Sequence, residues 1–181
     1  MSTTEAGVQV PGIVAMPSAR EQFLEAYERE HATTMRVLRA FPPEHAELRP
    51  HPKCKTAREL AFVFALERAF GTMAVNDAFA SGASPAMPPS PPESWDAILA
   101  AAESAHQEFG ELIRSMPDEK LFQTVKFFTG PMTLTDMPRI QVIWSLLCDE
   151  IHHRGQLSIY LRMADGRVPS IYGPTADEPW I

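Results

Sequence analysis

Cysteine is scarce in this chain, whose 181 residues include only Cys54 and Cys148. Two cysteines are too few for the disulfide framework of a small secreted domain. They do not form a CxxC pair either, so that redox or zinc motif is excluded. We therefore expect a protein of a reducing compartment, the cytoplasm.

The sequence also lacks basic clusters and long apolar runs. Lys and Arg number 16 against 23 acidic residues, the net charge is −7, and the basic residues are scattered. A protein that binds the nucleic-acid backbone needs a basic stripe, so we expect no nucleic-acid partner. No segment approaches the roughly 18 apolar residues of a membrane span. Residues 1–17 contain no Lys or Arg, so we expect neither a signal peptide nor a membrane partner.

Proline, in contrast, is plentiful at 17 residues, and it gathers between segments with helical periodicity. Ser18 with Glu21, and Thr56 with Glu59, have the spacing of capping boxes at helix starts. The chain thus predicts four helices, which run from Ser18 to about Ala40, from Thr56 to about Val75, from Glu93 or Ser94 to Met116, and from Thr135 or Asp136 to about Ala164.

The segment between the last two helices is rich in β-prone residues. We interpret Phe122–Phe127 and Met132–Leu134 as two short extended pieces of an insert rather than as a sheet. The Pro- and Gly-containing tail from Arg167 to Ile181 should be coil. The predicted fold is therefore all-α: an N-terminal arm, residues 1–17, precedes one four-helix-bundle domain, residues 18–181.

The fourth predicted helix carries the most informative stretch, Asp149 to Gln156. Asp149 and His153 are four residues apart and so lie on one helix face. The same face carries apolar residues that are typical of a core: Val142, Leu146, Leu157 and Tyr160. A polar pair inside an apolar stripe makes Asp149 and His153 the candidate catalytic or metal-binding residues.

This stretch and the tail after it closely resemble the C-terminal signature of the DinB (DinB/YfiT-like) family. The matching residues are His152-His153-Arg154-Gly155-Gln156-Leu157, Tyr160-Leu161-Arg162, Gly166, Pro169, Tyr172-Gly173-Pro174 and Ala176-Asp177-Glu178. Thr56-Ala57-Arg58-Glu59-Leu60 resembles the start of the family's second helix. The resemblance implies a four-helix bundle, often a homodimer, that carries a divalent metal, usually zinc or nickel, on three histidines. Some relatives are transferases or isomerases that use low-molecular-weight thiols.

The family's histidines are only partly kept in this chain. His153 matches the second histidine of the fourth helix, Asp149 stands at the first, and Val63 stands where the second helix has a histidine. Glu67, one turn after Val63, is a possible substitute ligand. Two outcomes stay open: a divalent metal on Asp149 and His153, or a hydrogen-bonded Asp149–His153 pair that seals a former metal pocket.

Several other residues receive structural interpretations. His152 should make packing contacts, Cys148 should be a buried inert thiol, and Gly155 should allow close approach of another backbone. Arg154 and Gln156 should tie the tail at Tyr172 to the helix, and Asp177 or Glu178 should pair with Arg162 or Arg154. We expect the remaining histidines to be solvated, with His51 the best replacement ligand: His31, His45, His51 and His106.

The sequence supports two functional hypotheses. The first is a DinB-like protein of unassigned activity, with a degenerate metal site, that acts as a non-catalytic or small-molecule-binding bundle. The alternative is a metal-dependent or thiol-dependent small-molecule transferase that uses a pocket around Asp149 and His153, where Asp149 would orient His153 as a general base.

Overall fold

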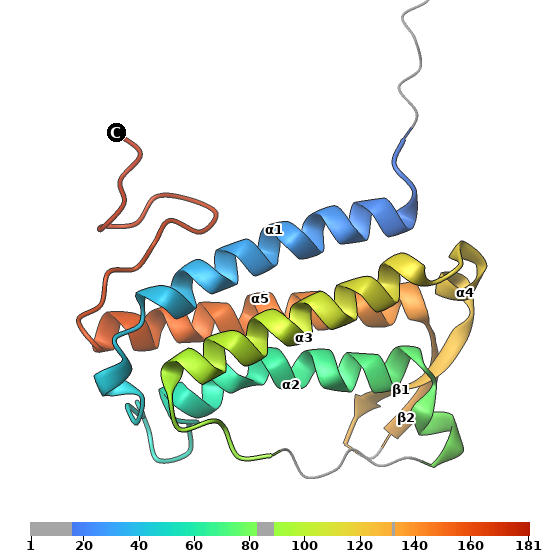
Figure 1. Ribbon diagram of the computed structural model, residues 1–181, viewed down its shortest axis with the longest axis horizontal. Coiled ribbons are helices and arrows are strands. Elements are labelled where there is room, and N and C mark those ends of the chain that lie inside the picture. Colours follow the sequence, from blue (N-terminus) through green and yellow to red (C-terminus); the bar gives the residue numbers. More distant parts are fainter. Residues whose placement is uncertain (1–15, 83–88, 132) are drawn as a thin grey trace, which may run out of the picture.

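The computed structural model describes residues 16–82, 89–131 and 133–181, so most of the predicted arm lies outside the described residues. Four long helices run alongside one another (Figure 1). They are α1 (Ala19–Ala40), α2 (Ala57–Val75), α3 (Trp95–Ser115) and α5 (Arg139–Met163). The predicted four-helix bundle is confirmed.

The starts of the first three long helices follow from capping residues. Ser18 and Thr56 each accept a hydrogen bond from the backbone N–H three residues on, and Glu21 and Glu59 reciprocate, so both predicted capping boxes form. Ser94 caps α3 in the same way, without the reciprocal partner. Each such cap contributes about 1 kcal/mol to stability. The local sequence therefore fixes these boundaries.

The predicted insert is a β-hairpin preceded by the short helix α4 (Asp118–Phe122). Strand β1 (Thr124–Gly130) pairs antiparallel with β2 (Thr133–Pro138). The insert between the third and fourth long helices is confirmed, but its two extended pieces pair as a two-stranded sheet, which the sequence interpretation did not expect. Side chains alternate between buried and more exposed along the first half of β1, which is the period of a half-buried strand.

The start of the last helix was also placed too early. Residues Thr135 and Asp136 pair with Phe127 and Lys126 of β1, so their backbone is extended and cannot be helical. Pro138 occupies the N-cap position without a side-chain capping bond, and the helix begins at Arg139. The cross-strand pairing overrides the helix-start signal that the sequence carries at Thr135 and Asp136.

The bundle core is divided along its length. In the packing, α2 contacts α3 and α5, and α1 contacts α3 and α5. One apolar cluster near the hairpin includes Phe23, Phe109 and Leu147. A second, at the other end, includes Leu38 and Leu157. Between them the helices bury polar side chains: Glu30, His31, Thr34, Glu67, Arg68, His106, Glu150 and Arg154.

Within the described ranges, the connections contain two short 3-10 helices, Pro43–His45 (η1) and Ala78–Ser81 (η2). After α5 the tail is coil, as predicted, and lies at the end of the bundle opposite the hairpin (Figure 1). Arg36 on α1 donates to the Ser170 carbonyl, which holds the tail against the bundle. Among the described residues, no helix is long and apolar enough to cross a membrane.

A candidate metal centre beside an apolar cavity

Three side chains bring their ligand atoms together where α2 meets α5. Glu67 projects from the middle of α2, and Asp149 and His153 project from α5. One ligand atom of each lies within 4.8 Å of the others. The Nδ1 atom of His153 is 2.6 Å from Oε1 of Glu67 and 3.8 Å from Oδ1 of Asp149. The site thus contains both residues of the predicted pair and the predicted substitute, Glu67.

The hydrogen-bond partner of His153 is Glu67 rather than Asp149. The predicted Asp149–His153 bond does not form at 3.8 Å, and Asp149 does not seal a pocket because its side chain is 53% exposed. The Glu67 side chain is only 8% exposed. Val63 is half-buried and contributes no ligand atom, and the candidate replacement His51 is exposed and outside this group.

Burial and proximity shift the protonation of the Glu67–His153 pair. Burial raises the pKa of Glu67 to about 7, against the opposing effect of the His153 hydrogen bond. The hydrogen bond to Glu67 raises the pKa of His153, although burial opposes this. The second carboxyl oxygen of Glu67, Oε2, is buried and has no hydrogen-bond partner among the described residues. Such an atom costs free energy unless something binds to it.

Each of the three site residues is followed in the sequence by a buried charged residue: Arg68, Glu150 or Arg154. Successive residues of a helix point about 100° apart. The site residues therefore lie on the cavity side of the contact between α2 and α5, while Arg68, Glu150 and Arg154 point into the bundle interior. Arg68 of α2 forms a buried ion pair with Glu150 of α5. This ion pair fixes the register that brings Glu67 against His153.

The second buried ion pair holds α5 to α1. Nη2 of Arg154 lies 2.7 Å from Oε2 of Glu30, and Nη1 donates to the Glu30 carbonyl at 3.0 Å. The Thr34 hydroxyl accepts from Arg154 at 3.3 Å and donates to Glu150 at 2.7 Å, and so joins the two pairs into one network. Arg154 also donates to the Tyr172 hydroxyl, which confirms its predicted tie to the tail.

Two histidines that were expected to be solvated, His31 and His106, are buried beside this network. His31 is 9% exposed and His106 is 4% exposed, and their rings stack at 3.5 Å. Tyr27 stacks on the other side of His106 at 4.2 Å, and its ring lies under the Arg68 guanidinium. The prediction was wrong because polar neighbours along one helix do not reveal a polar layer that four helices share.

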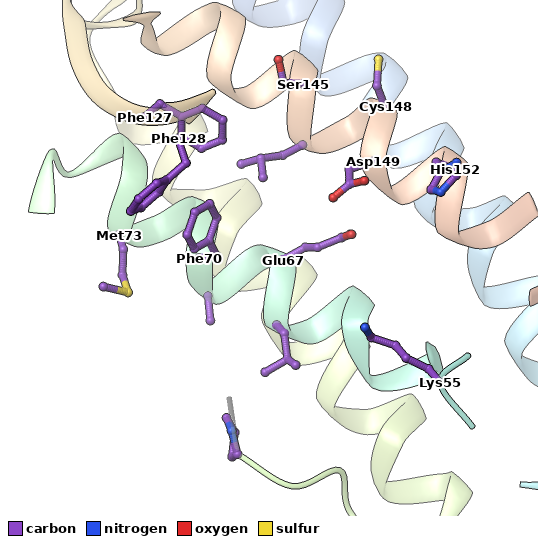
Figure 2. Close-up of a pocket in the computed structure, with 14 residues that line it drawn as sticks. Lys55, Glu67, Phe70, Met73, Phe127, Phe128, Ser145, Cys148, Asp149 and His152 are labelled. Carbon is purple, nitrogen blue, oxygen red and sulfur yellow. The ribbon is translucent and has the colours of Figure 1, made fainter. Parts of the chain in front are cut away.

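A cavity of about 900 Å³ opens beside the candidate ligands (Figure 2). Its lining divides into two regions. One is apolar, and the other carries polar and charged groups. The apolar lining residues include Leu66, Phe70, Met73, Phe127, Phe128 and Leu146, and the polar ones include Lys55, Glu67, Ser145, Cys148, Asp149 and His152. Figure 2 shows the Glu67 side chain extending from α2 towards Asp149 on α5.

The surface of α5 beside the cavity differs from the prediction at four residues. Cys148 is exposed and lines the cavity instead of being buried. His152 also lines it, and Gln156 bonds to His152 at 2.9 Å instead of reaching the tail. Among the described residues, a Cβ built on Gly155 would meet nothing within 4 Å, so none of them brings its backbone close there. The pairing of Asp177 with Arg162 is confirmed.

Comparison with solved structures identifies the fold. A DinB-like protein from Bacillus cereus aligns over 84% of this chain and 97% of its own, with a TM-score of 0.69 and 21% identity. YfiT from Bacillus subtilis, described as a probable metal-dependent hydrolase with an unusual four-helix bundle topology, aligns over 88% of this chain and 95% of its own, with a TM-score of 0.60 and 12% identity.

Sequence comparison gives the family. The uncharacterized protein YrdA of Bacillus subtilis is 30% identical over 81 residues, which are 42% of this chain. The match spans 46% of YrdA, so it covers less than half of that relative. The model of the DinB family matches residues 16–180, which are most of this chain. The chain therefore belongs to the DinB family.

Proposed function

We propose that the protein binds one divalent cation at Glu67, Asp149 and His153 and catalyses hydrolysis or group transfer on a small molecule held in the adjoining cavity. The observation that carries this proposal is the convergence of three ligand atoms within 4.8 Å at the cavity wall. The description of YfiT as a probable metal-dependent hydrolase supports the same class of reaction.

The residues present fit such a cation. Two carboxylates and one imidazole are ligands that zinc accepts, and three protein ligands leave a position for water or substrate. Imidazole also suits nickel. The partnerless Oε2 of Glu67 supplies an acceptor whose burial is costly without a ligand. The donor set is thus compatible with zinc or nickel at a site that keeps an open position.

The protonation state and the position of the site residues determine how they could hold a cation. When bound, the cation would act as a Lewis acid and lower the pKa of a water molecule. Glu67, whose pKa burial raises to about 7, must lose its proton before it can bind the cation. The apolar lining would contact the apolar part of the substrate, and Asp149 lies on the solvent side of the three ligands.

Metal titration tests the proposal. Protein purified without chelators should bind about one equivalent of Zn²⁺ or Ni²⁺ in isothermal titration calorimetry. Glu67→Gln and His153→Gln should each weaken binding by at least about tenfold, because each removes one of three ligands. His51→Gln, at an exposed loop histidine outside the group, is the matched control and should bind as the wild type does. No binding, or binding unaffected by the two site variants, contradicts the proposal.

A second function, small-molecule binding without catalysis, is favoured by the Glu67–His153 hydrogen bond. At 2.6 Å this bond satisfies both groups in part without any cation. In that case the cavity binds its ligand equally well in protein treated with EDTA and in protein loaded with zinc. Ligand affinity that is independent of metal would therefore favour this second function.

A further inference from the structure

We infer that the molecule bound in this cavity has an aromatic or otherwise apolar body and an anionic head group, and that Lys55 selects the head group. The inference rests on the proposed cation site and names the substrate class of that site. It follows from the two regions of the cavity lining, and from Lys55, the one lysine among the described residues that line the cavity.

The apolar region of the cavity suits a flat apolar body. Phe70 lies 5.8 Å from Phe127 and 6.3 Å from Phe128, measured between ring centroids. The rings are tilted rather than parallel, so they present both edges and faces to the cavity. A volume of about 900 Å³ lies in the range of cavities that hold drug-sized ligands. The body of the ligand should therefore lie among Phe70, Phe127 and Phe128.

The polar region becomes positive once the cation is bound. A divalent cation balances the two carboxylates, Glu67 and Asp149. The Lys55 side chain extends along the cavity from the residue before the α2 cap (Figure 2). Within the part of the chain that the structure describes, no ion pair or hydrogen bond engages its ammonium group. An excess positive charge then faces the ligand's head, which favours a carboxylate or similar anion and disfavours an ammonium group.

Three probes of one shape test the selection: naphthaleneacetate, naphthaleneethanol and naphthaleneethylamine, titrated into zinc-loaded protein and followed by calorimetry. The acetate should bind most tightly and the amine most weakly. Lys55→Gln should weaken binding of the acetate about fivefold and should change the affinity for the alcohol by less than about twofold. Only the anion pairs with the ammonium group of Lys55. Lys53→Gln, at an exposed residue that does not line the cavity, should change neither affinity.

Phe128→Ala tests the location of the apolar body, and it should weaken the acetate and the alcohol by a similar factor, about tenfold. Equal affinities for acetate and alcohol in the wild type, or no effect of Phe128→Ala on either probe, would overturn the inference. Zinc binding with no anion preference removes only this inference and leaves the cation site standing. Absence of zinc binding removes both.

Discussion

At the scale of single residues, two helical glycines have opposite surroundings. Gly155 lies inside α5, and a Cβ there would meet no atom of the structurally described part of the chain within 4 Å. An exposed glycine inside a helix costs about 1 kcal/mol relative to alanine. Gly155→Ala should therefore raise the free energy of unfolding by about 1 kcal/mol, measured by urea denaturation.

Gly71 in α2 is the matched control. A Cβ there would lie 2.9 Å from Leu146 Cδ1 and 2.9 Å from Phe109 Cε2, so the side chains around it would have to move. Gly71→Ala should lower the free energy of unfolding by about 1–3 kcal/mol. Equal effects of the two substitutions would show that helix propensity alone, and not the space around each residue, decides the outcome.

Only part of the candidate site could be predicted from the sequence. Asp149 and His153 share a face of one helix, and their spacing predicts this without any tertiary information. That Glu67 rather than Asp149 bonds to His153 depends on how far α2 is shifted along α5. Helical periodicity fixes the face of each helix but not the shift between two helices. Glu67 could therefore be named as a possible ligand, but not as the partner of His153.

At the scale of secondary-structure elements, Arg154 joins α5, α1 and the tail. It is 1% exposed and lies against both the carboxylate and the carbonyl of Glu30. Arg154→Met should lower the free energy of unfolding by about 3 kcal/mol, because it removes the only buried cation that pairs with the Glu30 carboxylate among the described residues and leaves it with the exposed Arg29 and the Tyr172 hydroxyl. Urea denaturation measures this loss. Hydrogen exchange should also quicken in residues 167–181, since Tyr172 loses its contact with Arg154.

Arg162→Met is the control at the same scale. Arg162 pairs with Asp177 of the tail, but its side chain is 48% exposed. Exposed ion pairs contribute little to stability, so this substitution should leave the urea midpoint nearly unchanged. A loss as large as that of Arg154→Met would mean that anchoring of the tail, and not the buried charge, accounts for both effects.

Some boundaries of helices and strands could be predicted from the sequence, and others could not. The caps at Ser18 and Thr56 are local signals that side chains and backbone complete within four residues. Strand β2 was predicted too short, because its residues are exposed and lack an alternating pattern. What makes Thr135 and Asp136 extended is their pairing with β1, which no local pattern encodes.

At the scale of the whole molecule, the buried histidines make stability depend on pH. Burial lowers the pKa of His31 and of His106 below the ordinary value of 6.5, although Glu103 and Glu28 respectively oppose the shift. Below pH 6.5 the unfolded chain takes up protons at both residues that the folded chain does not. The free energy of unfolding should therefore decrease as the pH falls from 7 to 5, because protonation of these two histidines favours the unfolded chain.

Urea denaturation of wild type and His106→Gln at pH 7, 6 and 5 measures this contribution. The variant should lose less stability between pH 7 and pH 5 than the wild type. The Glu67–His153 pair also titrates, but it is present in both proteins and so cancels in the comparison. Equal pH dependence of the two proteins would contradict a lowered pKa for His106.

The alternation of site residues and buried partners along α2 and α5 has an evolutionary consequence. Positions 67, 149 and 153 carry the candidate ligands, while positions 68, 150 and 154 hold the helices in register through Glu30, Arg68, Glu150 and Arg154. Substitutions at the first three positions therefore leave the ion pairs that align the helices in place. A lineage built on this bundle can exchange one ligand for another, or discard the cation, without having to rebuild its fold.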